Sequence, residues 1–567
     1  MLKNLMQINM KKIIKNIWVL LAVLYLGSCT SDYLDINDDP NYPTEAVMNQ
    51  LLPGGEYYMT QALGQGNFIG NSLQTFVHQL VMREVQNYGM TPGDNNIFNS
   101  WNYLYTYALP AFDAIIDAGE EDGNLIYAGV AKTLKAYSFS VMVDLWGDIP
   151  YSEFNVQGVT NPKPDSSKDI YNSLITLLEE AQADLNNAEA ENGLRPGADD
   201  FFYAGNVDKW TRLNNTIQLK LLLQSRKAKE DITGWKTKLD ALISEDNFIE
   251  SGEDFEFWFN TGTTPQDMRH PAISQYTGQQ TNYISPFFYE TMTGITLNTT
   301  DNPFSGIRDP RVPYYFVNQL KDGQDSENSH EYRNGNFMSI FFATNGPNAS
   351  GSNDKSLTKI GFYPAGGKYD DGNGGAISLE SKYGQAPHKM VTYFSLKFML
   401  AELVLAGETT GDARELLEEA INASIDHIHA MIDKQLDADQ KSTPKIEDAD
   451  RNEFVDDVLA IYDAADAEGK MEIVMTQKWI ANFFNPIDSY TDYRRTGYPV
   501  MFDPAKTTIP GSGVNPTVEE GSPAEVPLMD FRSYPRSLYY PTNSETELNP
   551  NMTQKSDLSK SFVFWDK

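Results

Sequence analysis

The sequence predicts a mainly α-helical protein, in which a scaffold of tetratricopeptide-like helix pairs carries a long, irregular and loop-rich inserted lobe. Three observations lead to this prediction. Apolar residues recur every three or four positions in several segments, which is the spacing of one helix face. Turn-forming residues are concentrated in one stretch, at about residues 252–389. The chain has 567 residues, of which 41% are hydrophobic, so it can bury a large core.

The scaffold helices are expected in seven stretches: 126–145, 166–185, 210–221, 393–403, 416–428, 454–465 and 473–484. The first stripe stops at Gly147, and Ser166 to Asp169 fits a capping box that starts the second. Gly407 stops the fourth. Neighbouring stripes can pair as antiparallel hairpins, which is how tetratricopeptide units are built, but no strict 34-residue period is kept. The repeats are therefore expected to be degenerate.

The predicted lobe interrupts this scaffold. Gly, Asn, Thr, Pro and aromatic residues dominate it, and residues 345–375 are nearly all of the turn-forming type. The chain after Phe484 is again rich in proline and irregular. Because binding residues often lie in loops that a rigid scaffold holds, this lobe is a natural place for a ligand site.

The charge of the chain excludes one class of partner. There are 44 Lys and Arg against 78 Asp and Glu, which gives a net charge of −34. Nucleic-acid binding needs a basic surface, so no nucleic-acid partner is expected. The same charge favours neutral ligands over strongly anionic ones.

The N-terminus reads as an export signal. A positive region of Lys11, Lys12 and Lys15 precedes an apolar run of ten residues, Ile17 to Leu26, which is too short to span a membrane. The run ends in Leu26-Gly27-Ser28-Cys29, which resembles a bacterial lipobox, and Cys29 is the only cysteine. Residues 1–28 are therefore expected to be a lipoprotein signal peptide, with Met1 or Met10 as its start. Residues 29–567 would form the mature domain, anchored through lipid on Cys29.

Catalytic and metal motifs were sought and not found. Carboxylate pairs have no diagnostic weight among 78 acids, and His427 and His429 are two apart on a predicted helix, so they point to different sides. The metalloprotease spacing and the G-x-S-x-G elbow are absent. The stretch Asp35 to Pro40 begins like a calcium loop, but Pro40 stands where glycine is needed. No enzyme activity, metal or cofactor is expected.

Six strings, in order along the mature chain, resemble SusD/RagB-type nutrient-binding outer-membrane lipoproteins. They are Tyr33 to Asn41, Asp144 to Tyr151, Trp210 to Lys220, Gln477 to Ala481, Arg494 to Pro499, and a closing pattern of Pro535, Arg536, Tyr540, Pro541, Glu545, Asn549 and Trp565. Lys220 stands where arginine is usual. Trp146, Trp210, Trp479 and the Arg494-Arg495 pair within these strings are expected to be core groups rather than ligand contacts.

The resemblance implies a cell-surface lipoprotein of the outer membrane. Proteins of this family cap a SusC-like TonB-dependent transporter and deliver glycans or peptides to it, and they bind without catalysis. An oligosaccharide is the expected ligand here. Peptide capture is the alternative, and a surface glycosidase or an adhesin are further alternatives that the helical stripes favour less.

Ligand contacts are predicted from loop aromatics and their polar neighbours, because aromatic faces stack on sugar rings. The predicted residues are Arg83, Tyr88, Trp101, Asn102, Trp258, Tyr276, Tyr283 and Tyr369. They are expected to form a shallow site from two regions, residues 83–102 and 258–283. The alternative for Trp101 is that it begins a helix, with Leu104 and Ala108, and packs inward.

Overall fold

The predicted scaffold helices all form. The computed structural model describes residues 47–82, 88, 90–276, 282–296, 302–326, 332–342, 355–377, 382–501 and 533–567. The helices in this part of the chain are α2 (Met48–Leu63), α3 (Ile69–Phe76), α4 (Asn95–Tyr103), α5 (Leu109–Glu121), α6 (Leu125–Trp146), α7 (Ser167–Leu185), α8 (Val207–Gln224), α9 (Trp235–Glu245), α10 (Pro286–Thr293), α11 (Val312–Tyr315), α13 (Tyr393–Leu405), α14 (Ala413–Lys434), α15 (Ala438–Lys441), α16 (Asp448–Ala464), α17 (Ala467–Ala481) and α18 (Pro486–Thr496).

Short elements complete the described chain. Five shorter helical turns are η2 (Leu104–Ala108), η3 (Arg226–Asp231), η4 (Pro271–Tyr276), η5 (Thr542–Thr546) and η6 (Leu558–Lys560). The strands form antiparallel pairs: β1 (Leu80–Met82) with β5 (Asn282–Ile284), β2 (Ile149–Pro150) with β3 (Pro164–Asp165), β4 (Phe255–Trp258) with β10 (Pro387–Val391), β6 (Phe316–Val317) with β9 (Lys359–Ile360), and β7 (Tyr332–Asn334) with β8 (Phe337–Ser339). Leu51–Lys567 form one compact unit, which contains all the contacts described below.

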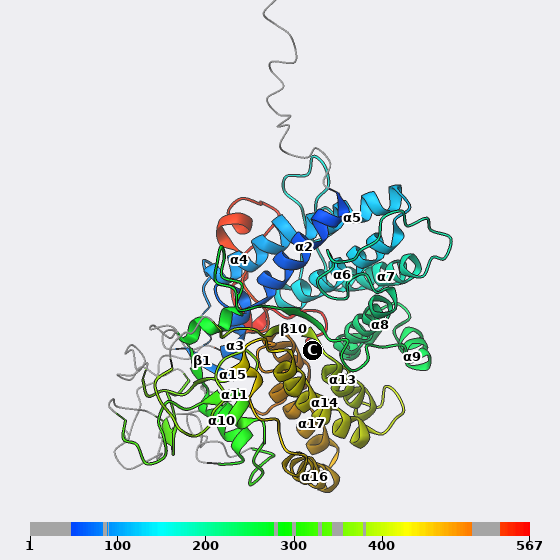
Figure 1. The fold of residues 1–567 in the computed structure, drawn as a ribbon. Helices are drawn as coiled ribbons and strands as arrows, with labels where there is room; N and C mark the ends of the chain where they lie inside the picture. The colour runs from blue at the N-terminus through cyan, green and yellow to red at the C-terminus, as the bar shows by residue number, and fades with distance from the viewer. Residues whose placement is uncertain are drawn as a thin grey trace, which may run out of the picture. The chain divides into compact units, whose positions relative to one another are not determined.

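Helices that follow one another pack as antiparallel neighbours. The helices α5, α6, α7 and α8 make successive contacts along the chain, and α13 packs on both α14 and α17 (Figure 1). This is the arrangement expected of tetratricopeptide-like pairs, and it confirms the predicted fold class. Ser166 caps α7 as predicted, since its hydroxyl accepts the backbone N–H of Asp169 at 3.2 Å.

Helix α6 lies at the centre of the group formed by α5, α6, α7 and α8. Nearly all of its side chains are buried, so it is apolar on every side rather than on one stripe. Gly129 allows α7 to approach, because a Cβ there would lie 2.7 Å from Cγ of Leu185. The helix ends at Gly147, whose φ of 78° is accessible to glycine at little cost.

A buried ion cluster joins α13, α17 and α18. Arg495 on α18 contacts Glu402 on α13 and Asp492, each at 2.6 Å, and Lys478 on α17 contacts Asp492 at 2.9 Å. Burial would raise the pKa of Glu402, but Arg495 and Arg226 outweigh burial and hold that pKa well below its usual range. Trp146, Trp210, Trp479, Arg494 and Arg495 are all buried, so the family-like strings build the core, as predicted.

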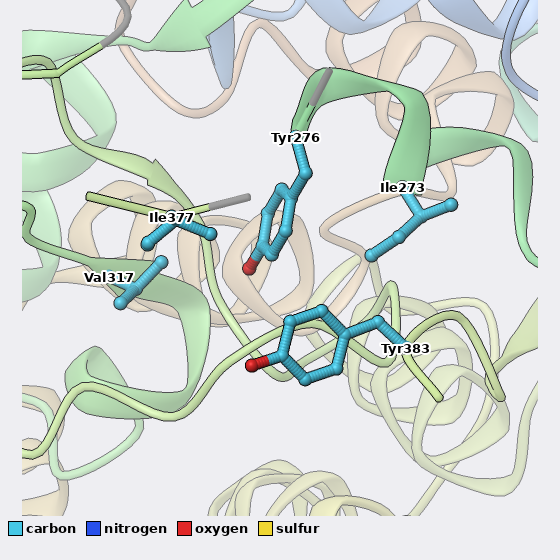
Figure 2. Packing of buried hydrophobic residues seen from close by; sticks show 5 residues of the cluster. All are labelled: Ile273, Tyr276, Val317, Ile377 and Tyr383. Carbon is cyan, nitrogen blue, oxygen red and sulfur yellow. The ribbon is translucent and has the colours of Figure 1, made fainter. Parts of the chain in front are cut away.

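In the stretch predicted as an irregular lobe, residues 252–389, the described residues form short strands, the short helices α10 and α11, the turn η4 and irregular turns. Its packing is largely aromatic. Figure 2 shows one buried cluster, in which the ring of Tyr276 descends from η4 toward Val317, Ile377 and Tyr383. The rings of Tyr276 and Tyr383 meet edge to face, with centroids 5.9 Å apart.

The C-terminal segment is bonded to the end of α6. Trp146 donates its indole N–H to the carbonyl of Tyr539 at 2.9 Å, and Leu538 donates its backbone N–H to Leu145 at 2.8 Å. Trp565 in turn donates to Asp144 at 2.8 Å. These bonds place residues about 400 positions apart in the sequence against one another. The same C-terminal segment supplies Ser544, Glu545, Leu548 and Asn549 to the site described next.

Candidate functional site

Trp101 stands at the junction of α4 and the C-terminal segment. Asp94 caps α4 by accepting the N–H of Asn96 at 2.8 Å, which starts the helix that carries Trp101. The indole packs edge to face on Trp146, and its N–H donates to Oε1 of Glu545 at 2.8 Å. Its exposed fraction is 2%, so the second reading from the sequence, a helical Trp101 that packs inward, is the one the structure shows.

A pocket of about 320 Å³ opens beside this indole. We call it the aromatic pocket, and it is lined by Trp101, Tyr105, Pro150, Phe154, Thr160, Asn161, Pro162, Ser544, Glu545, Leu548 and Asn549. Three aromatic rings, two amides, two hydroxyl-bearing residues and one carboxylate therefore face one space. This is a composition suited to a neutral, hydroxyl-rich ligand, because rings stack on its C–H faces and amides bond its hydroxyls.

Hydrogen bonds between distant segments hold the walls of the aromatic pocket. Tyr105 in η2 donates its hydroxyl to the carbonyl of Pro150 at 2.7 Å, and its ring meets Phe154 edge to face at 5.3 Å. Asn549 donates to the carbonyl of Pro162 at 2.8 Å, which ties the C-terminal segment to the loop after β2. The pocket is thus preformed rather than dependent on one loop.

The aromatic pocket carries little charge. Glu545 is the single charged residue among its lining residues in the described chain. Burial raises the pKa of Glu545, while the hydrogen bond from Trp101 acts in the opposite direction. Burial, with Glu545 and Tyr540 nearby, also raises the pKa of Tyr105 well above its ordinary value, so this hydroxyl stays neutral at physiological pH.

A second pocket, of about 640 Å³, lies where the stretch 306–314 meets α16. We call it the acidic pocket, and it is lined by Gly306, Arg308, Asp309, Pro310, Pro313, Tyr314, Tyr369, Pro444, Lys445, Ile446, Glu447, Asp450, Glu453, Phe454 and Asp457. Tyr369 meets Tyr314 edge to face at 5.0 Å, and Tyr314 donates to the carbonyl of Pro444 at 2.5 Å. Five carboxylates and two basic groups face this space.

The remaining predicted residues fall in separate places. Tyr88 is buried against Phe76, His78, Phe342 and Tyr534. Asn102 on α4 is partly exposed, and its carbonyl accepts the hydroxyl of Thr106 at 2.9 Å. Arg83 and Cys29 lie outside the described residues.

The aromatics predicted in the lobe are mostly interior. Tyr276 is buried in the cluster of Figure 2 and donates to the carbonyl of Ile360 at 2.5 Å. Tyr283 is buried in β5, where it pairs with Val81 of β1. Trp258 ends β4 and donates to Oε1 of Glu256 at 2.7 Å. The β1–β5 pairing sets residues 80–82 beside residues 282–284.

Sequence reasoning did not select most of the residues that line the aromatic pocket. Tyr105, Phe154 and Asn161 belong to no string with a recognisable chemistry. Glu545 and Asn549 stand in the closing pattern of the family resemblance, which is the signal that pointed to that segment. Glu545 lies more than 440 positions from Trp101 in the sequence, and tertiary packing brings the two residues together.

The helical scaffold and the preformed aromatic pocket define a class: a protein of tetratricopeptide-like helix pairs with a pocket held against its C-terminal segment. No helix among the described residues is long and apolar enough to cross a membrane. The family described as starch-binding and associating with the outer membrane matches residues 40–517. The chain therefore belongs to the SusD-like family.

Solved structures of that family share the fold. A SusD homologue from Bacteroides fragilis matches with a TM-score of 0.61 at 17% identity, covering 92% of this chain and 99% of the other. A SusD/RagB family protein from Bacteroides thetaiotaomicron gives 0.61 at 20% identity, with 92% and 99% covered. A chitin-binding SusD homologue from Flavobacterium johnsoniae gives 0.59 at 19% identity, with 91% and 98% covered. The chain matches none of the curated proteins.

Proposed function

We propose that this protein is a cell-surface lipoprotein that captures oligosaccharides in the aromatic pocket and delivers them to a SusC-like TonB-dependent transporter. The observation that carries the proposal is the aromatic pocket, where Trp101, Tyr105 and Phe154 face amides across about 320 Å³ in a chain of the SusD-like family. That volume suits one or two sugar rings, so the rest of a longer glycan would lie outside the pocket.

The Flavobacterium relative, described as chitin-binding, supports a neutral or N-acetylated glycan as the ligand class. The chemistry of the lining agrees, because one carboxylate and several amides suit hydroxyl and acetamido groups better than phosphate or sulfate. No acid–base pair is needed for this role, since the transporter receives the glycan intact.

The test is calorimetric titration with a chito-oligosaccharide and a malto-oligosaccharide. Phe154 is the best residue to change, because it lines the pocket and is only partly buried, whereas Trp101 also supports the core. One stacking contact contributes about 1 kcal/mol. Phe154→Ala should therefore weaken binding about fivefold without a change in melting temperature.

Phe201→Ala is the matched control. Phe201 is 49% exposed and packs on Phe257, away from the pocket lining, so its loss should leave glycan affinity unchanged. If a glycan binds the wild type and Phe154→Ala equally well, the aromatic pocket is not its site. If neither glycan binds the wild type at all, the proposed ligand class is wrong.

The anchor and the transporter partner have their own tests. Cys29→Ser should lose fatty-acid labelling and leave the membrane fraction, whereas Ser31→Ala should stay membrane-bound. Purification in a mild detergent should recover a large β-barrel protein together with the wild type. Retention of the Cys29→Ser protein on membranes in high salt would contradict the anchor, and a partner-free wild type would contradict delivery to a transporter.

Capture of basic peptides is a second candidate function, and the acidic pocket favours it. Glu447, Asp450, Glu453 and Asp457 all lie on or just before α16 and are exposed around a space of about 640 Å³. A trilysine peptide in the same calorimeter separates the candidates. Binding of the peptide without binding of either glycan would assign the protein to peptide uptake.

A further inference from the structure

Three potential metal ligands meet where the first strand of the lobe lies against the scaffold. Asp254 and Glu256 stand at the start of β4, and His427 lies on α14, 171 positions beyond Glu256. Each offers one ligand atom, and these three atoms all lie within 4.8 Å of one another. Nε2 of His427 is 2.8 Å from Oε2 of Glu256. Glu256 and His427 are both buried, and Asp254 is partly exposed.

The surrounding contacts hold these side chains in place. Asp254 accepts the backbone N–H of Tyr393 at the start of α13, at 2.7 Å. Glu256 accepts the indole N–H of Trp258 at 2.7 Å. The ring of His427 is packed edge to face between Tyr363 and Phe394. The three potential ligands are therefore held in place before an ion binds, which reduces the free-energy cost of ordering them on binding.

The charge of the cluster is only loosely compensated. Nζ of Lys434 is 3.7 Å from Oε1 of Glu256, and its side chain is 55% exposed. The same ammonium lies 4.2 Å from the centroid of the Trp258 ring, so its departure would lose that one contact. Lys389, the other cation nearby, is directed elsewhere: its Nζ donates to the hydroxyl of Tyr363 at 2.6 Å and to the carbonyl of Phe483 at 2.8 Å. Nδ1 of His427 is buried and has no hydrogen-bond partner in the described chain.

We propose that Asp254, Glu256 and His427 form a binding site for Zn²⁺ or a similar divalent transition metal. One imidazole and two carboxylates suit zinc, manganese or iron, whereas calcium and magnesium prefer all-oxygen sites. Atoms bound to one zinc ion at about 2.0–2.2 Å lie at most about 4.4 Å apart, so small side-chain movements close the site. Lys434 leaves when the ion enters, and water completes the coordination.

The site would act as a cross-link rather than as a catalyst. Asp254 and Glu256 lie where the lobe enters β4, and His427 lies on the scaffold helix α14. A bound ion would therefore tie the lobe to α14. Binding to the folded state alone would then stabilise the protein by an amount that grows with the logarithm of the free metal concentration. This role is independent of the glycan or peptide that the protein captures.

The experiment uses the mature chain freed of metal with a chelator. Zn²⁺ is added alone, and binding is followed by calorimetry, by the melting temperature and by the fluorescence of Trp258, which bonds one of the ligands. We expect saturable binding of one Zn²⁺, a higher melting temperature, and at least tenfold weaker binding of Ca²⁺. Replacing an outer-shell partner of a metal commonly costs about 10–100-fold in affinity. Loss of a direct ligand in His427→Gln should cost at least as much.

His429→Gln is the matched control. It lies two positions along α14 and accepts the N–H of Ile446 at 3.0 Å, so it should bind Zn²⁺ like the wild type. Lys434→Ala tests the proposal without touching a ligand: removing the competing cation should tighten Zn²⁺ binding several-fold. Equal Zn²⁺ affinity in the wild type, His427→Gln and Lys434→Ala would overturn the proposal, as would the absence of Zn²⁺ binding to the wild type.

Discussion

The aromatic pocket and the acidic pocket are both walled by tyrosine and phenylalanine, but they are built from different parts of the molecule. The aromatic pocket lies on the helical scaffold, between α4, η2 and the C-terminal segment, and one carboxylate lines it. The acidic pocket lies between the lobe and α16, and five carboxylates line it. Similar aromatic rings can therefore line pockets for neutral ligands and for basic ligands. The charge of each pocket is set by the side chains that distant segments place beside the rings.

The one aromatic residue that the sequence predicted in each pocket is buried to a different depth. Trp101 is 2% exposed and packs on Trp146, whereas Tyr369 is only partly buried and meets a single ring, Tyr314, among the ring contacts found in the described chain. Trp101 is thus part of the core. Tyr369 stands at the edge of the acidic pocket, whose other two rings, Tyr314 and Phe454, are buried.

The largest expected effect follows from this difference. Trp101→Ala should lower the free energy of unfolding by about 3–5 kcal/mol, because it empties a core position and frees the buried carboxylate of Glu545. Tyr369→Ala should cost only about 1 kcal/mol, in the range of ordinary substitutions. Urea unfolding of the two variants measures both values. Equal losses would mean that Tyr369 supports the core as much as Trp101 does.

Sequence patterns predicted the scaffold well because its helices carry the information locally. The stripes in 126–145 and 166–185 became α6 and α7 with their ends at Gly147 and at the Ser166 cap. Helices such as α2 and α18 were not predicted, because Pro53 and two glycines interrupt the first and the second is short and polar. Tertiary packing overrides such weak local preferences.

The pockets could be predicted only in part. The sequence pointed to Trp101 and Tyr369 as aromatic residues of interest, and each lines one pocket. It could not show that Tyr276 and Tyr283 would be interior, since a loop aromatic looks the same in sequence whether it is packed or exposed. Nor could the sequence show that Trp101 contacts Glu545, or that Glu256 contacts His427. Those contacts are set by the fold between residues that are far apart in the chain.

A second prediction uses pH to sharpen the comparison. Burial raises the pKa of Glu545 above that of an unfolded glutamate, so the folded state favours the protonated form. Its contribution to stability is then fully present below the unfolded pKa, about 4.5, and is lost as pH rises through the folded pKa. Glu545→Gln keeps an acceptor for Trp101 and removes the titration. The stability of the wild type relative to this variant should therefore fall as pH rises above about 4.5.

The control for that measurement is Glu547→Gln, which changes an exposed carboxyl two positions away. Its stability relative to the wild type should vary little over the same pH range, because this side chain is exposed and lines neither pocket. A wild type that gains stability relative to Glu545→Gln as pH rises would show that the hydrogen bond from Trp101 outweighs burial.

The smallest expected effect is the sharpest test of whether the pockets act separately. Glu453→Gln combined with Asp457→Asn removes two of the five carboxylates of the acidic pocket and leaves the aromatic pocket intact. Glycan affinity should change by less than about twofold, since a neutral ligand gains little from distant charges and salt screens exposed charges beyond about 10 Å at 0.1 M. A trilysine peptide, if it binds, should lose affinity in the double variant and at high salt. Calorimetry with both ligands at two salt concentrations measures this. A marked loss of glycan affinity in the double variant would mean that the glycan reaches α16, and that the two pockets are parts of one extended site.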